Sequence, residues 1–183
     1  MSLLITTEQI TGGAGSDTIS GFEHLTGSKF NDRLIGSAGA NKIVGDSGND
    51  VVIGDAGADT LTGGGGDDAF RYRTPTEGSD IILDFFNSAT EADKIRIIKS
   101  GFLIPARIAV DAAVAADDFG LHYFVDGAAT AGNAPAATEA HGQFLFNTTS
   151  NELFWDSNGT AAGGTTLIAT LNTALQATDF ELR

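Results

Sequence analysis

Six nearly identical nonapeptides run through residues 12–70 of this chain of 183 residues. Five follow one another without a gap and begin at Gly27, Gly36, Gly45, Gly54 and Gly63; a sixth, residues 12–20, precedes the insert 21–26. Each copy fits the pattern G-[GSD]-x-[GF]-x-[DN]-x-Φ-x, in which Φ is an apolar residue. A fixed period of this kind is typical of solenoids, in which units stack and bury their apolar side chains against their neighbours.

Each nonapeptide predicts a tight turn followed by a very short strand. The glycine-rich part tolerates positive φ and so favours a turn, and the single apolar side chain between polar ones fits a strand with one face inward. Two units then make one coil, so residues eighteen apart lie directly above each other. This places Asp32 over Asp50, Asn41 over Asp59 and Asp50 over Asp68.

A column of stacked carboxylates repels itself unless a positive charge lies between its members. Lysine or arginine is one solution, but the five contiguous repeats up to residue 70 hold only Lys29, Arg33 and Lys42, all in the early units. A hard divalent cation is the better candidate, because Ca²⁺ prefers six to eight carboxylate and carbonyl oxygens, and glycine-rich turns have backbone carbonyls to spare. With no cysteine and only 3 histidines, the chain is a poor candidate for zinc or copper.

The overall charge agrees with this interpretation. A formal net charge of −14 and a pI of about 4.2 argue against nucleic acid or an anionic membrane as a partner. Glycine-rich repeats bury little apolar surface, so we expect the metal-free chain to be disordered.

The repeats resemble the RTX nonapeptide repeat, a haemolysin-type calcium-binding repeat of bacterial proteins exported by type I secretion. The resemblance implies an all-β fold: a parallel β-roll that binds several Ca²⁺ ions and is capped by a C-terminal β-rich region with hairpins. It also implies how the ligands are shared, since the carbonyls of turn positions two and four and the Asp of one turn face the carbonyls of positions one and three and the Asp eighteen residues later.

Carried over to this chain, the resemblance implies three complete sites and two at the ends. The complete sites are Ser28, Phe30, Asp32, Gly45, Ser47 and Asp50; Ser37, Gly39, Asn41, Gly54, Ala56 and Asp59; and Asp46, Gly48, Asp50, Gly63, Gly65 and Asp68. Across the insert, Gly13, Gly15 and Asp17 are expected opposite Gly27, Lys29 and Asp32; at the far end, Asp55, Gly57 and Asp59 are expected opposite Asp80, with Asp84 as the alternative.

Some residues depart from the family pattern. Phe30 replaces a turn glycine, and Asn41 replaces an aspartate, so the site of Asn41 is expected to be weaker. At Asp46 and Asp55 only the carbonyl is needed, so their side chains are expected to add negative charge to the surface.

Beyond Phe70 the period ends, and the chain divides into further regions. We expect a lead-in at 1–11, the roll at 12–71, a cap at 72–104, an Ala/Gly-rich connection at 105–142 with one or two strands around 121–125, and a C-terminal β module at 143–183. Segment 80–86 resembles the D-x-I-x-D-F cap of RTX proteins, and 93–95 its D-K-I. Residues 144–156 predict a hairpin and 166–171 a further strand; Asp156 and Asn158 fit either another ion site or a plain turn.

The last residues, 175–183, resemble the uncleaved C-terminal signal of type I substrates, although Arg183 departs from its apolar finish and a simple last strand fits equally well. Enzyme motifs are absent: there is no H-E-x-x-H, no G-K-[ST] follows Gly63–Gly66, and His24, His122 and His141 lack ligand spacing. Trp155 is expected in the core.

We therefore expect a non-catalytic, calcium-triggered folding and export module, secreted to the extracellular space, with an upstream partner domain. The N-terminus does not resemble a signal peptide, and no apolar run is long enough to span a bilayer. Two alternatives remain: a polysaccharide-binding module, for which Arg71 and Arg73 are the only basic pair, or a structural piece of a cell-surface adhesin.

Overall fold

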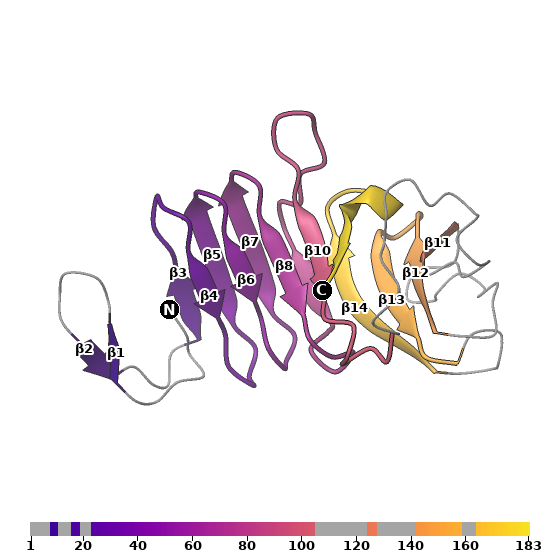
Figure 1. Ribbon diagram of the computed structural model, residues 1–183, viewed down its shortest axis with the longest axis horizontal. Helices are drawn as coiled ribbons and strands as arrows, with labels where there is room; N and C mark the ends of the chain where they lie inside the picture. The colour runs from indigo at the N-terminus through magenta and orange to yellow at the C-terminus, as the bar shows by residue number, and fades with distance from the viewer. Residues whose placement is uncertain (1–7, 11–15, 19–22, 105–123, 128–141, 159–163) are drawn as a thin grey trace.

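The computed structural model describes residues 8–10, 16–18, 23–104, 124–127, 142–158 and 164–183. Within them the chain forms strands and one short 3₁₀ helix, η1 (Ala177–Asp179). The strands of the roll alternate between two parallel sheets that face each other, which Figure 1 shows as a ladder of coils running away from the N-terminus.

One sheet has 5 strands and the other has 8. The five-stranded sheet contains, in spatial order, β15 (Phe180–Leu182), β10 (Lys94–Ile97), β8 (Ala69–Tyr72), β6 (Val51–Ile53) and β4 (Arg33–Ile35). The eight-stranded sheet contains β11 (Phe124–Gly127), β12 (Gln143–Asn147), β13 (Glu152–Asp156), β14 (Thr165–Leu171), β9 (Asp80–Ile82), β7 (Thr60–Gly65), β5 (Lys42–Ser47) and β3 (His24–Thr26).

The predicted register of eighteen residues is confirmed inside the roll. Leu34 pairs with Val52, Ile43 pairs with Leu61, and both pairings are parallel. The register lengthens only where the repeats end: Leu61 pairs with Ile82, and Phe70 pairs with Ile95. The predicted β-roll is therefore present, and the cap continues both of its sheets.

The core of the roll is formed by the one inward-facing apolar side chain of each repeat. Leu34, Ile43, Val52, Leu61 and Phe70 are each at most 1% exposed. Burial of one such side chain stabilises the fold by about 1.5–3 kcal/mol, so the repeats are held together by a single file of apolar contacts between the sheets.

The insert 21–26 holds the first strand of the roll, which the sequence analysis missed. Leu25 lies in β3, pairs with Ile43 eighteen residues later and is buried. The upstream copy, by contrast, contributes β2 (Ser16–Thr18), which pairs antiparallel with β1 (Glu8–Ile10) in a separate two-stranded sheet. The expected stacking of that copy on the roll is therefore wrong for β2. Gly13 and Gly15 lie outside the described residues.

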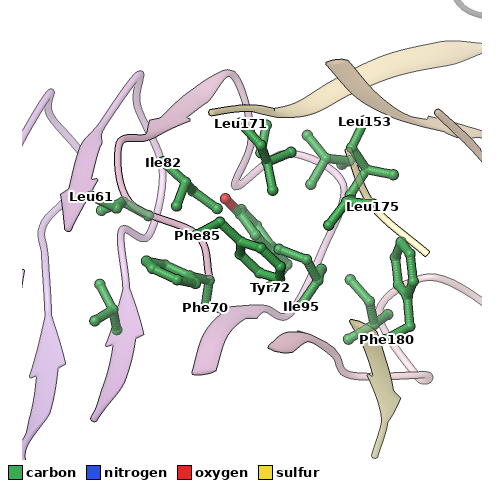
Figure 2. Packing of buried hydrophobic residues seen from close by; sticks show 14 of the residues in the cluster. Leu61, Phe70, Tyr72, Ile82, Phe85, Ile95, Leu153, Leu171, Leu175 and Phe180 are labelled. Atoms are coloured by element: carbon green, nitrogen blue, oxygen red, sulfur yellow. The ribbon is translucent and has the colours of Figure 1, made fainter. Parts of the chain in front are cut away.

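The C-terminal region packs onto the last coils, as predicted. The expected hairpin is β12 and β13, which pair antiparallel, and β14 joins it to β9 of the cap. Phe102, Phe144, Trp155 and Phe180 form an aromatic group with ring centroids 4.8–5.5 Å apart, which confirms Trp155 as a core residue. Figure 2 shows how this apolar packing continues from Leu61 and Phe70 to Phe180.

The chain end is part of the sheet. β15 pairs in parallel with β10, and the backbone N–H of Arg183 donates to the carbonyl of Ile97. Of the connection 105–142, β11 and Gly142 are described; β11 overlaps the strand expected around 121–125, and His122 and His141 lie outside the described residues. No helix among the described residues is long and apolar enough to cross a membrane.

Candidate metal centre

The turns of the roll align the predicted ligands in two columns. The first column comprises Asp32, Asp50, Asp68 and Asp93, in the turns that lead into the five-stranded sheet; the second comprises Asn41, Asp59 and Asp80, at the entrances to the eight-stranded sheet. In each column the backbone N–H of one member donates to the Oδ1 atom of the next. These bonds are 2.7 Å to Asp50, 2.8 Å to Asp68 and 2.9 Å to Asp93 in the first column, and 2.7 Å to Asp59 and 3.0 Å to Asp80 in the second.

The second carboxylate oxygen of these residues is buried and unsatisfied. Asp50, Asp59, Asp68 and Asp80 are each at most 1% exposed, and their Oδ2 atoms have no hydrogen-bond partner among the described residues. A buried carboxylate without a partner is strongly unfavourable. Arg33 and Lys42 take outward positions on their strands, and Lys29 lies over the ring of Phe30. A divalent cation is therefore a better candidate than these basic side chains to neutralise the columns.

At the first glycine of three repeats, predicted ligand oxygens from two neighbouring coils lie close together. A Cβ added to Gly45 would lie 2.2 Å from the carbonyl oxygen of Gly63 and 2.3 Å from Oδ2 of Asp50. At Gly36 the corresponding neighbours are the carbonyl of Gly54 and Oδ1 of Asn41, at 2.2 and 2.5 Å.

Gly27 repeats the arrangement with the carbonyl of Gly45 and Oδ2 of Asp32, at 2.4 and 2.9 Å. A carbonyl from one coil and a side-chain oxygen from the preceding coil therefore converge at all three predicted complete sites, which is the oxygen-rich donor set that Ca²⁺ requires.

The later turns share one backbone shape. Asp46 and Asp55, at position two, have φ of 85° and 72°, and Gly48 and Gly57, at position four, have φ of 113° and 117°. Aspartate tolerates this region better than most residues. The side chain of Asp55 is not free on the surface as expected, because it pairs with Arg73, whereas Asp46 is exposed.

The first two turns differ from the later ones. Among the described residues, positive φ does not occur in the turns 27–32 and 36–41. This explains how Phe30 fits in place of glycine: its backbone is not left-handed, and its side chain is 67% exposed. Here the ligand oxygens are held by the turn itself, since the N–H of Ser28 donates to Oδ2 of Asp32 at 2.6 Å and the N–H of Ser37 to Oδ1 of Asn41 at 2.6 Å.

Burial raises the pKa of Asp50, Asp59, Asp68 and Asp80. Desolvation is the largest cause in every case; it raises the pKa of Asp59 and Asp68 to about 6 and that of Asp80 to about 8. Asp50 also has a raised pKa, mainly from burial and then from Asp32 and Asp46. A divalent cation would reverse this effect by favouring the ionised form.

The cap supplies carboxylates in place of a further coil. Asp80 lies opposite Asp59, as the resemblance implied. Asp84, the alternative, instead accepts hydrogen bonds from the N–H groups of Gly63 and Gly64 at 2.9 and 2.8 Å, so it takes the place of the next strand's carbonyls.

Asp93 was not among the metal ligands expected from the sequence. It ends the first column, and both of its oxygens accept backbone hydrogen bonds, from Asp68 and Phe86; burial raises its pKa to about 7. The signal was present, because Asp80 and Asp93 each begin a D-x-Φ triplet like that of the repeats.

Other expected positions are less informative. Among the described residues no group of three or more His, Cys, Asp or Glu side chains has a metal-binding arrangement; each implied site contributes at most two such side chains, and backbone carbonyls supply the rest. The N–H of Asn158 donates to Oδ1 of Asp156 at 3.0 Å, which is a local turn contact. The side chain of Asp17 is not described.

Comparisons with known proteins agree with the repeat pattern. The family described as "RTX calcium-binding nonapeptide repeat (4 copies)" matches residues 6–24, 20–52 and 44–71. Among solved structures, the solution structure of the AlgE6R3 subunit from the Azotobacter vinelandii Mannuronan C5-epimerase is similar, with 25% sequence identity, coverage of 84% of this chain and 79% of that chain, and a TM-score of 0.35. No curated protein matches the chain.

Proposed function

We propose that this chain, which carries RTX calcium-binding nonapeptide repeats over residues 6–71, is a module that folds on binding extracellular Ca²⁺ and supports type I secretion of a larger protein. The observation that carries the proposal is the set of buried, unsatisfied Oδ2 atoms of Asp50, Asp59, Asp68 and Asp80, stacked coil upon coil. When bound, Ca²⁺ supplies the positive charge that these oxygens lack.

The same residues make folding depend on the metal. In the metal-free chain the columns bring like charges together inside a fold that has only one file of apolar contacts, so the unfolded state is favoured. Extracellular calcium modules have dissociation constants of about 10⁻⁴–10⁻³ M, and a ligand that binds only the folded state stabilises it by mass action. Because Asp50 and Asp59 each belong to two implied sites, occupancy of neighbouring sites is expected to be cooperative.

The export part of the proposal rests on the low calcium inside cells and on the C-terminal segment. An unfolded chain suits passage through a narrow channel, and calcium outside would then drive folding. Residues 175–183 have the acidic and apolar composition of a secretion signal. In the folded chain they form η1 and β15 beside β10, so the signal would be accessible before folding. The exported protein would include an upstream domain.

The folding switch is tested by titrating the purified chain with calcium in far-UV circular dichroism. We expect a cooperative coil-to-sheet transition near millimolar Ca²⁺ that Mg²⁺ does not reproduce. Asp50→Ala should weaken the response, whereas Glu23→Gln, at an exposed residue outside the predicted sites, should leave it unchanged. A chain that is fully folded in chelator and indifferent to calcium contradicts the proposal.

Export is tested separately, in a bacterial host with a type I exporter. Deletion of residues 175–183 should abolish secretion into the medium, and Glu181→Gln, which removes one ion-paired charge but keeps the length of the segment, should not. Secretion that continues without the segment would remove the export function while leaving calcium-dependent folding intact.

A second candidate function is binding of an acidic polysaccharide. The sequence offered only Arg71 and Arg73 as a basic pair, but the fold adds Arg33 and Arg96 to it. Burial, followed by the charges of Arg33, Arg73 and Arg96, lowers the pKa of Arg71. Arg96 lies beside Arg71 on the neighbouring strand, so four guanidinium groups gather on the outer face of the five-stranded sheet of an otherwise acidic protein.

Arginine pairs well with carboxylate groups, although Asp55, Glu77 and Glu181 already neutralise part of this face. Titration with alginate at saturating calcium, with Arg71→Ala as the variant and Lys42→Ala on the opposite sheet as the control, distinguishes this candidate. Alginate binding that is lost only in Arg71→Ala would support it, and no binding would exclude alginate as a ligand.

A further inference from the structure

Three charged side chains join the last turn of the repeats to the cap. Nη2 of Arg73 lies 2.5 Å from Oδ1 of Asp55, and Nε of Arg73 lies 2.8 Å from Oε1 of Glu77. The backbone N–H of Arg73 also donates to Oε2 of Glu77 at 2.8 Å. The carboxylate side chains of Asp55 and Glu77 are only 15% and 9% exposed, so one guanidinium group holds two largely buried acidic groups.

These residues keep the period of the repeats although the repeat pattern has ended. Arg73 lies eighteen residues after Asp55, and Glu77 lies eighteen residues after Asp59. Glu77 therefore comes at the phase at which each repeat carries its column carboxylate. In the structure, however, the N–H of Asp59 donates to Oδ1 of Asp80 at 3.0 Å. The carboxylate that completes the second column thus comes three residues later than the period requires.

The ion pair accounts for this shift. Glu77 accepts from the backbone of Arg73 and is neutralised by its guanidinium. The N–H of Glu77 donates to the carbonyl of Thr74 at 3.2 Å, which closes a tight turn. The charge of Glu77 is therefore compensated within the chain, whereas Oδ2 of Asp80 has no hydrogen-bond partner among the described residues.

Asp55 connects this cluster to an implied metal site. The resemblance implies the carbonyl of Asp55 as a ligand of the last site, and its φ of 72° is left-handed, a conformation that persists where the surroundings fix it. Asp46, at the same position of the preceding repeat, has a φ of 85° and is fixed by pairing with Gly64 of β7. β6 ends at Ile53, before Asp55, so the ion pair with Arg73 takes the place of that strand pairing.

We propose that Arg73 is a positioning residue for the last metal ion of the second column. By holding the side chain of Asp55, it fixes the turn that offers its carbonyl to the last site. By holding Glu77, it leaves Asp80 to complete that site. The inference rests on the proposed function, because it assumes that the columns bind Ca²⁺. It adds that the last site depends on a cation that is built into the chain.

The cap in turn holds Arg73 in place. A Cβ added to Gly101 would collide with the carbonyl oxygen of Arg73, and one added to Gly78 would collide with the carbonyl oxygen of Leu167. The turn that carries Arg73 and Glu77 is therefore packed without spare room between the residues that follow β10 and strand β14. A rigid support of this kind is what a positioning side chain requires.

The test is Arg73→Gln in the full chain, with Ca²⁺ binding measured ion by ion in equilibrium dialysis and calorimetric titration. We expect one ion to bind about tenfold more weakly, the usual effect of losing one interaction with a charged group, with little change in the others. Lys42→Gln removes the same charge from an exposed, outward position of β5 and should bind every ion as the wild-type chain does.

Two further variants separate positioning from simple stabilisation. Asp55→Asn removes the ion pair but keeps the carbonyl and a residue type that tolerates left-handed backbone, so it should weaken the same ion even if Arg73→Gln folds poorly. The double variant should bind that ion no more weakly than either single variant, because the two side chains act as a pair. Phe180→Ala, which weakens the aromatic packing, should instead lower the urea stability and shift all ions together.

Unchanged binding of every ion in Arg73→Gln or in Asp55→Asn, or an equal shift of all ions in both, would overturn the inference while leaving calcium binding in place. A wild-type chain that takes up no Ca²⁺ would overturn the proposed function together with it.

Discussion

In the absence of metal, the stability of the roll should fall as the pH rises, which is the reverse of ordinary acid denaturation. Burial raises the pKa of Asp80 to about 8 in the folded chain, against about 3.9 when unfolded. Between these values the folded state binds more protons than the unfolded state, so stability is greatest below about pH 4 and is lost as the pH rises through 8.

The magnitude follows from Asp80 alone. At 1.36 kcal/mol per pH unit, the rise in the pKa of Asp80 from about 3.9 in the unfolded chain to about 8 in the folded chain costs the folded state stability. The loss is about 6 kcal/mol above pH 8 and about 4 kcal/mol at pH 7. Small domains are stable by only about 5–15 kcal/mol in total. Asp59 and Asp68, with pKa values of about 6, act in the same direction, so the metal-free fold should not survive at neutral pH.

The assay is urea unfolding in chelator, followed by circular dichroism, at pH 5.0 and 7.5. The wild-type chain should show sheet structure at the lower pH and little at the higher. Asp80→Asn should stabilise the metal-free fold at pH 7.5 by several kcal/mol, yet require more calcium for full folding, whereas Glu23→Gln, at an exposed residue outside the predicted sites, should change neither. Stability that rises with pH in chelator, or an Asp80→Asn chain that behaves as wild type, would refute the reasoning.

Three further results are expected. Asp50→Ala should shift the calcium midpoint further than Asp32→Ala, because Asp50 belongs to two implied complete sites; equal shifts in dichroism titrations would argue against shared ligands. Asn49 joins Asn31 and Asp67 in a ladder of hydrogen bonds that needs no metal, so Asn49→Ala should lower the urea stability by about 0.5–1 kcal/mol even at saturating calcium, and an effect confined to low calcium would be inconsistent with it. Phe180→Ala should cost the calcium-loaded chain about 3–5 kcal/mol in the same measurement, because Phe180 is 6% exposed and stacks near Phe144; an unchanged chain would mean that β15 is not part of the folded unit.

Most of the roll could be predicted because its contacts repeat. Once Asp32, Asp50 and Asp68 were seen to be eighteen residues apart, the glycine turns and apolar strand positions required that they stack, and the pairings of β4 with β6 and of β5 with β7 follow that period. The period misled at the insert and in the copy before it. Leu25 keeps the spacing to Ile43 although the residues around it do not match the repeat, and β2 of the upstream copy pairs with β1.

The sequence by itself determined the two columns of stacked Asp and Asn side chains and, through them, the expectation that a cation binds between the coils. Only the tertiary structure decided how the columns end: Asp93 lies twenty-five residues after Asp68, and Asp80 lies twenty-one after Asp59. Inside the repeats every coil fixes the register of the next, so local pattern is enough. In the cap no repeat exists, and the register is set by which apolar side chains fill the end of the core.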